Sequence, residues 1–247
     1  DRAADASSEP TPDPAAPTEL AEAQDAAPLA MWVGDASARW LINSHPAPLA
    51  ADEALGTIEG WLRPTGGRGW ILISGGAGSG KSALVATLIR RLTTTRGAPA
   101  HHFIRRGHRD WDQPYAVQAA LVVQLERQYP DVANVDAPPE RRLIELLLRL
   151  SNRHLIPNCE KLYILIDGLD ELDSDGEENP LPRFLPPALP PGVMFICSLR
   201  AGHPYAPFFE DRAARTLDLD RAFGSRAVRA FWSHHGPLIG LPPDVQI

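Results

Sequence analysis

The chain has 247 residues, of which 44% are hydrophobic and 22% are charged, enough for a full core and one or two domains. Its net charge of −7 and lack of a long basic run argue against a general nucleic-acid binder, which needs clustered arginine and lysine. No apolar run approaches the ~20 residues that span a membrane. Cys159 and Cys197 form neither a disulfide framework nor a metal-ligand spacing, so we expect a cytoplasmic protein.

The beginning of the chain differs in composition from the rest. Residues 1–30 are rich in alanine, proline, acids and serine, and cannot bury enough surface to offset the entropy of ordering. We therefore expect a disordered acidic, proline-rich linker, followed by one domain over residues 31–235. We expect residues 236–247 to be a tail or the start of a further domain. Since there is neither an initiator methionine nor a signal-peptide pattern, we expect a piece of a longer protein.

Helices and strands are predicted to alternate along the domain. Apolar residues at helical spacing predict helices over residues 35–43, 49–62, 81–95, 114–129, 140–154 and 221–234. Apolar runs predict buried strands over residues 70–73, 100–105, 162–166, 193–197 and 216–219. This alternation predicts an α/β fold, a five-stranded parallel sheet with helices on both faces.

The motif that gives the chain its chemistry lies between the first of these strands and the helix after it. It fits G-x-x-x-x-G-K-[ST] and consists of Gly75, Gly76, Ala77, Gly78, Ser79, Gly80, Lys81 and Ser82. Glycines let several backbone N–H groups converge on one anion, and the start of the helix adds its positive end. In this P-loop, Lys81 is expected to reach the β- and γ-phosphates and Ser82 to bind Mg²⁺. The expected ligand is a nucleoside triphosphate with magnesium.

An acidic group follows the strand over residues 162–166. Asp167 is positioned as the Walker B carboxylate, which holds Mg²⁺ through its water shell. Either Asp170 or Glu171 is expected to orient or deprotonate the attacking water, and the sequence leaves the choice between them open. At the end of the next strand, Arg200 is expected to contact the γ-phosphate through charge-assisted hydrogen bonds.

These motifs together resemble a known class of proteins. The P-loop, the sequence Asp167-Gly168-Leu169-Asp170-Glu171, and a strand ending in Ser198-Leu199-Arg200 after a proline-rich stretch look like the NACHT-type domain of STAND P-loop NTPases. Trp61-Leu62 and His102-Phe103 look like the bacterial branch of that class. The resemblance covers residues 40–234.

The resemblance implies a sheet order and a way of working. The P-loop strand should lie between the arginine-bearing strand and the last strand. The domain should be a switch that is closed with ADP and self-associates with ATP, with an effector domain before it and a sensor region after it. The winged-helix domain that normally follows is not recognisable before Ile247. The preference for adenine over guanine also rests on the resemblance alone.

Other interpretations remain open at this stage. The basic stretch over residues 105–109 is interpreted as a solvated loop, with a nucleic-acid patch or an intersubunit arginine finger as alternatives. The leading hypothesis for the whole domain is a signalling switch that hydrolyses ATP slowly. The alternatives are a continuously active ATPase or P-loop small-molecule kinase, and a scaffold that does not hydrolyse nucleotide.

Overall fold

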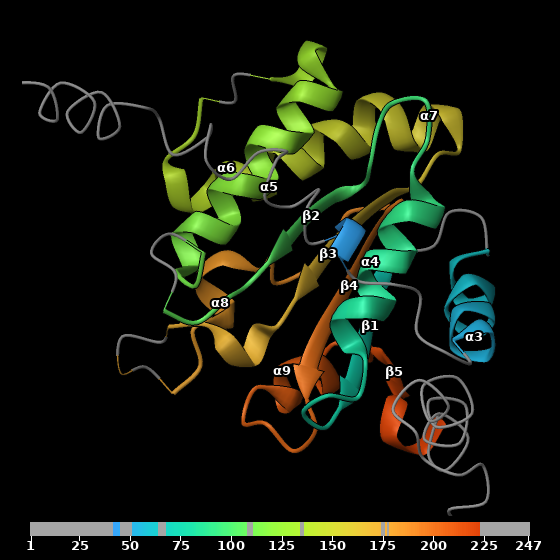
Figure 1. The fold of residues 1–247 in the computed structure, drawn as a ribbon. Helices are drawn as coiled ribbons and strands as arrows, with labels where there is room; N and C mark the ends of the chain where they lie inside the picture. Colours follow the sequence, from blue (N-terminus) through green and yellow to red (C-terminus); the bar gives the residue numbers. More distant parts are fainter. Residues whose placement is uncertain are drawn as a thin grey trace, which may run out of the picture.

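The computed structural model describes residues 42–44, 51–63, 68–107, 111–133, 136–173, 176 and 178–222. The predicted linker and tail lie outside these residues, as do most of the helices predicted over residues 35–43 and 221–234. The α-helices and strands are labelled in Figure 1. In chain order the elements are α3 (Asp52–Leu62), β1 (Gly69–Gly75), α4 (Lys81–Leu92), β2 (Ala100–Phe103), α5 (Pro114–Gln128), η2 (Pro130–Val132), α6 (Pro139–Leu150), η3 (Ser151–Leu155), α7 (Ile156–Asn158), β3 (Leu162–Asp167), η4 (Leu169–Glu171), α8 (Leu181–Phe184), β4 (Val193–Arg200), α9 (Ala206–Glu210) and β5 (Arg215–Asp218).

The strands form one parallel five-stranded sheet in the order β2-β3-β4-β1-β5. The predicted fold class is therefore confirmed, and β1 lies between β4 and β5 as the resemblance implied. Because all strands run in the same direction, the residues that follow them meet at one edge of the sheet. That edge carries the P-loop after β1, Asp167 at the end of β3 and Arg200 at the end of β4.

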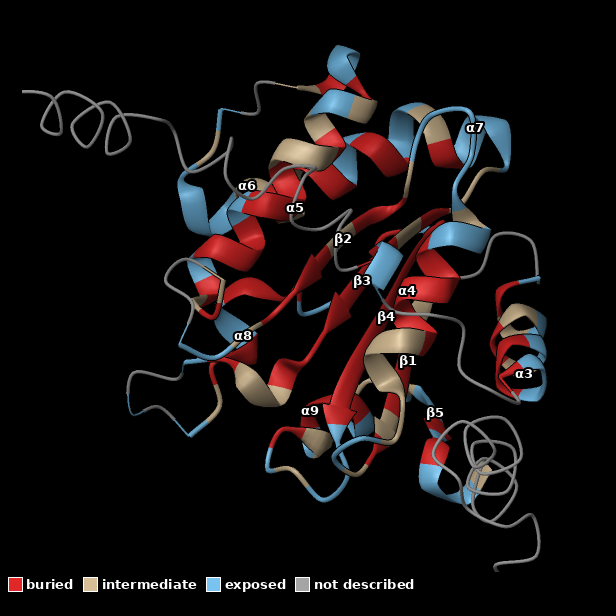
Figure 2. Ribbon diagram, viewed as in Figure 1, coloured by how far each residue is buried: buried red, intermediate tan, exposed pale blue. Residues whose placement is uncertain are grey.

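The sheet is buried on both faces (Figure 2). Along β1, Trp70 and Leu72 belong to the core that contains α5, α6 and α9, whereas Ile71 and Ile73 belong to the core with α3 and α4. Alternate residues of one strand point to opposite faces, so a strand covered on both sides must be apolar throughout. This explains why the strands appear in the sequence as unbroken apolar runs.

Several element boundaries differ from those predicted, and two of the differences have a clear physical reason. The helix after the P-loop ends at Leu92 rather than 95, because Thr93 is extended and Thr94 exchanges two backbone hydrogen bonds with Gly97. The helix predicted over residues 140–154 is α-helical only to Leu150. It continues as the π-helical turn η3, in which the buried Ser151 hydroxyl donates to the carbonyl oxygen of Pro191 at 2.7 Å. A tertiary hydrogen bond of this kind is invisible to a local pattern.

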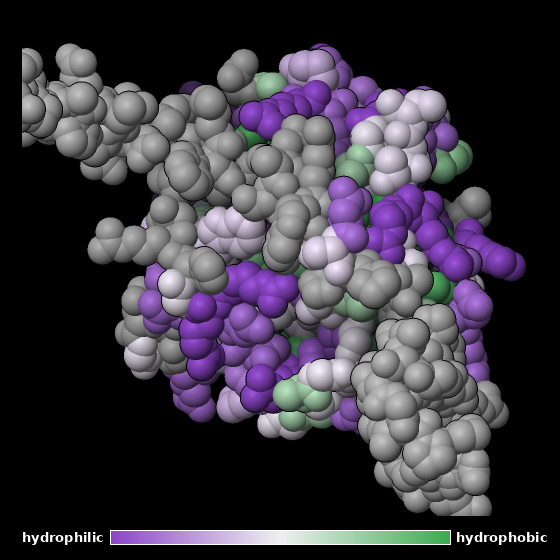
Figure 3. Space-filling model, in the orientation of Figure 1, coloured by the Kyte–Doolittle hydropathy of each residue, from purple (hydrophilic) through white to green (hydrophobic). Residues whose placement is uncertain are grey.

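The visible surface is mainly hydrophilic, in agreement with the 22% of charged residues in the sequence. Hydrophilic side chains predominate on the face seen in Figure 3, with small apolar areas between them. Within the described part of the chain, no helix is both long enough and apolar enough to span a bilayer.

Candidate nucleotide-binding site

The P-loop joins the end of β1 to the start of α4, as its sequence predicts. Gly78 and Gly80 have φ angles of 75° and 90°, a region that residues with a Cβ rarely adopt. Gly75 is required for a different reason, because a Cβ at this position would lie 2.5 Å from Oγ of Ser79. The loop therefore needs glycine at one position for space and at two for backbone conformation.

Lys81, the first residue of α4, folds back over the loop. Its Nζ donates to the carbonyl oxygens of Gly75 at 2.8 Å and Gly76 at 2.7 Å. An ammonium group has three donors, so one N–H remains for an oxygen of a bound phosphate. The lysine is thus fixed at the start of a helix, where the helix dipole also favours an anion.

Asp167 lies at the end of β3 and is only 3% exposed. The Ser198 hydroxyl donates to Oδ1 of Asp167 at 2.6 Å, and the Gly168 N–H donates to the Ser198 oxygen at 2.8 Å. Burial raises the pKa of Asp167, while hydrogen bonds from Ser198 and Ser82 and the charge of Arg105 oppose this rise. The carboxylate is therefore a buried group whose negative charge a cation would stabilise.

Ser82 lowers the pKa of Asp167, so the two predicted Mg²⁺ ligands lie near each other. Mg²⁺ prefers oxygen ligands and usually keeps several waters, so it needs one or two protein groups in addition to phosphate oxygens. The described residues contain no group of three or more His, Cys, Asp or Glu side chains that suits a metal. A serine and an aspartate beside a P-loop fit a nucleotide-bound Mg²⁺, which when present would neutralise phosphate charge.

The two acids of η4 have different surroundings. Asp170 accepts the backbone N–H of Arg200 at 3.1 Å, and its other oxygen lies 3.4 Å from Nε of that arginine. Its side chain is 8% exposed, whereas that of Arg200 is 57% exposed. Glu171 accepts the backbone N–H of Arg106 at 3.2 Å. Asp170 is thus committed to Arg200, while Glu171 contacts the segment after β2.

The start of the basic stretch over residues 105–109 is more than a solvated loop. Arg106 is exposed, yet its guanidinium also donates to the carbonyl oxygen of Asp170 at 2.8 Å. The charge of Arg105 acts on Asp167. Arg106 is thus exposed, as the solvated-loop interpretation expects, and also contacts the segment after β3, because β2 and β3 are neighbours and end at the same edge. Residues 108–109 lie outside the described part of the chain.

Two residues at this edge were missed in the sequence. Ser198 was noted only as part of the strand end, but its hydroxyl donates to Asp167. Asp220 lies just after β5, and its Oδ2 accepts the Gly76 N–H at 2.7 Å. The only sequence signal for Ser198 was its place two residues before Arg200, and Asp220 gave none, since 144 positions separate it from Gly76.

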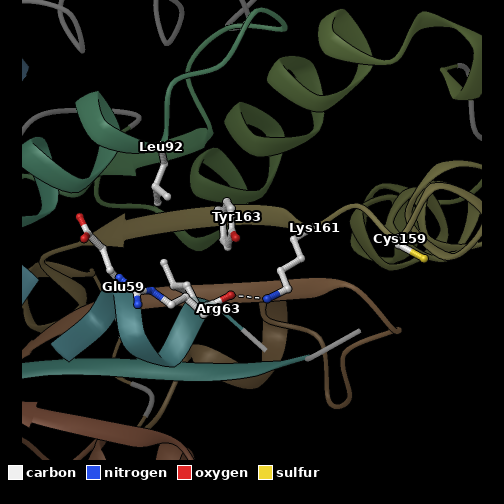
Figure 4. A pocket seen from close by; sticks show the side chains of 7 residues that line it. Glu59, Arg63, Leu92, Cys159, Lys161 and Tyr163 are labelled. Carbon is white, nitrogen blue, oxygen red and sulfur yellow. Dashed lines mark hydrogen bonds between the residues drawn. The ribbon is translucent and has the colours of Figure 1, made fainter. Parts of the chain in front are cut away.

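A shallow pocket of about 450 Å³ lies at the opposite edge of the sheet (Figure 4). Its lining includes Lys161 and Tyr163 at the start of β3 and Leu92 at the end of α4. Lys161 donates to the carbonyl oxygen of Leu62, as the dashed line in Figure 4 shows, and burial lowers its pKa. None of the predicted site residues lines this pocket.

The fold and the P-loop edge together define a nucleotide-binding domain of the P-loop NTPase class. Residues 55–186, more than half of the chain, match the family described as nephrocystin 3, N-terminal, and the chain belongs to this family. The match includes the P-loop, Asp167, Asp170 and Glu171. No curated protein matches the chain.

Two solved structures are similar to part of this fold. One is Cdc6p from Pyrobaculum aerophilum, with 12% identity and a TM-score of 0.44 over 71% of this chain and 46% of that one. The other is Drosophila ORC bound to GC-rich DNA and Cdc6, with 11% identity and a TM-score of 0.46 over 94% of this chain and 38% of that one. The chain thus spans less than half the length of either.

Proposed function

We propose that the domain is a nucleotide-dependent signalling switch that binds Mg²⁺ with ATP or ADP. The observation that carries the proposal is that Lys81, Ser82 and Asp167 meet at one sheet edge, beside an arginine that an acid already holds. Lys81 and the loop amides suit the phosphates, and Ser82 and Asp167 suit Mg²⁺. Arg200, held by Asp170, is the group that distinguishes ATP from ADP.

The remaining parts of the proposal concern turnover and assembly. Glu171 orients water for slow hydrolysis, because Asp170 is already committed to Arg200. ATP drives self-association and hydrolysis resets the switch. The domain acts as the central cytoplasmic module of a larger bacterial immune or stress receptor of the NACHT type, between an effector and a sensor region. Support for this receptor role comes from the resemblance of the motifs.

Equilibrium binding of radiolabelled ATP and ADP with Mg²⁺ tests the nucleotide site. Lys81→Ala should weaken ATP by about a hundredfold, because it removes the positive charge expected beside the β- and γ-phosphates, and should weaken ADP clearly but less, because ADP has no γ-phosphate. Lys161→Ala is the matched control, since it removes the only other lysine in the chain at the opposite edge of the sheet. Equal binding by wild type and Lys81→Ala would overturn the site assignment.

Light scattering after size-exclusion chromatography separates the switch from the other two functions. The proposal expects larger particles with ATP than with ADP, and ADP that is retained through the column. Fast turnover by a protein that stays monomeric would instead favour a continuously active ATPase or a small-molecule kinase. An unchanged Tm with saturating Mg·ATP would favour a scaffold, because a ligand that binds only the native state must stabilise it.

A further inference from the structure

The peptide group between Gly75 and Gly76 is contacted from three parts of the chain. Its carbonyl oxygen accepts Nζ of Lys81 at 2.8 Å and the backbone N–H of Ala201 at 3.2 Å. Its N–H, on the opposite side of the same peptide plane, donates to Oδ2 of Asp220 at 2.7 Å. The peptide thus lies between a cation at its oxygen and an anion at its N–H.

This arrangement fixes the orientation of the peptide plane. An N–H bonded to a carboxylate makes the carbonyl oxygen of the same peptide a better acceptor, because hydrogen bonds in series polarise one another. Hydrogen bonds to charged groups are also stronger than neutral ones. Rotation of the 75–76 peptide would break both the hydrogen bond that it donates to Asp220 and the one that it accepts from Lys81. The position of Lys81 therefore depends on the acceptor at residue 220.

Asp220 is itself held in place by its neighbours. Oδ1 of Asp218 accepts the backbone N–H of Asp220 at 3.0 Å and that of Arg221 at 3.2 Å, as an N-cap residue does. Leu219 is fully buried in the core with α3 and α4. The cap and the buried leucine leave the carboxylate of Asp220 directed at the P-loop.

The first two residues of the loop also pack against this segment. A Cβ on Gly75 would lie 3.3 Å from Cβ of Leu219, and a Cβ on Gly76 would lie 3.4 Å from Oδ2 of Asp220. The contact is therefore a packed surface as well as a single hydrogen bond. Glycine at position 75 therefore helps the segment after β5 to approach the loop, whereas a Cβ at position 76 would make an ordinary van der Waals contact.

We propose that Asp220 is a positioning residue of the nucleotide site, which holds the 75–76 peptide so that Lys81 faces the phosphates. This inference rests on the proposed function, because it presumes that the P-loop binds nucleotide. Asp220 acts through the peptide and not on the nucleotide, so its main requirement is a hydrogen-bond acceptor, which the negative charge strengthens.

Binding of Mg·ADP to four variants tests the proposal. Asp220→Ala removes the acceptor, and Asp220→Ser draws it back from the Gly76 N–H because its side chain is one atom shorter, so each should weaken binding by about tenfold. Asp220→Asn keeps an acceptor oxygen at the same position and should stay within about threefold of wild type. Asp136→Ala, which removes an exposed aspartate from the loop before α6, should have no effect. Thermal melting without nucleotide shows whether each variant is folded.

The outcomes distinguish this proposal from the one on which it rests. Wild-type affinity in Asp220→Ala and Asp220→Ser overturns the role of Asp220 and leaves the nucleotide site standing. Equal loss in Asp220→Asn and Asp220→Ala also overturns it, because the amide would not have rescued the bond. No nucleotide binding by the wild type at all would instead overturn the proposed function.

Discussion

Asp170 receives the backbone N–H of Arg200 on one carboxylate oxygen and lies 3.4 Å from Nε of the same arginine with the other. Asp170, which follows β3, thereby holds both the main chain and the side chain of Arg200 at the end of β4. Because the side chain of Asp170 is nearly buried and that of Arg200 is mostly exposed, the pair holds the arginine at the surface of the site. An incoming γ-phosphate would meet an arginine that is already oriented.

Removal of Arg200 should therefore change ATP binding and leave ADP binding almost unchanged. We expect Arg200→Ala to weaken ATP by about tenfold, the value of one charge-assisted hydrogen bond, and ADP by less than twofold. Asp170→Ala should show the same selective loss, because Arg200 is then no longer held. The two affinities can be measured by calorimetry, with Arg149→Ala on α6 as a control. Equal losses for ATP and ADP would contradict a role in reading the γ-phosphate.

Substitutions of the two acids of η4 should have different effects on ATP hydrolysis and ATP affinity. Glu171→Gln is expected to lower the rate of ATP hydrolysis by about a hundredfold, within the range of general-base catalysis, with ATP affinity kept within a few-fold. Asp170→Asn should lower ATP affinity as well, since it disturbs Arg200. Single-turnover hydrolysis and equilibrium binding together give both quantities. If Glu171→Gln kept full activity, a group other than Glu171 would have to orient the attacking water.

The sequence predicts the parts of this site that local patterns determine. A buried strand followed by an acid, and a glycine-rich turn before a helix, place Asp167 and Lys81 at one edge once the sheet is parallel. The five strands were predictable because both faces of the sheet are covered, which makes each strand a continuous apolar run.

The remaining features depend on contacts between distant residues. Asp220 and Gly76 are far apart in the chain, and the hydrogen bond between them has no sequence signal of its own. Which of Asp170 and Glu171 faces Arg200 likewise follows from the geometry of η4 and not from a local pattern. The hydrogen bond from Arg106 to Asp170 also depends on β2 lying beside β3, which no local pattern shows.

Burial of the His102 side chain should make the stability of the fold depend on pH. Burial lowers its pKa from 6.5 to about 4, and its Nε2 lies 2.9 Å from the carbonyl oxygen of Trp111, so the neutral ring donates there. The unfolded chain binds a proton between these two pKa values and the folded chain does not. This contribution to stability is therefore complete above pH 6.5 and is lost as the pH falls toward 4.

The loss due to His102 should be about 2 kcal/mol between pH 7 and pH 5. His102→Gln keeps an N–H donor but does not titrate. Between pH 7 and pH 5 its unfolding free energy should therefore fall by about 2 kcal/mol less than that of wild type. Urea denaturation at the two pH values measures the difference. The assignment would be wrong if wild type and His102→Gln lost the same amount.

Ser198 links the stability of the protein to its Mg²⁺ site. Ser198→Ala would leave the Gly168 N–H without its acceptor and remove a donor from Asp167, both in a buried position. We expect a loss of about 1–3 kcal/mol in unfolding free energy, the usual cost of a buried unsatisfied group. Mg²⁺ should also stabilise the nucleotide complex less than in wild type, because Asp167 is no longer oriented.

Ser151→Ala is the matched control: it removes another buried serine hydroxyl, which bonds Pro191 away from the P-loop edge. It should lose similar stability and keep the wild-type dependence of ADP binding on Mg²⁺. If Ser198→Ala kept that dependence as well, Ser198 would serve only to stabilise the end of β4.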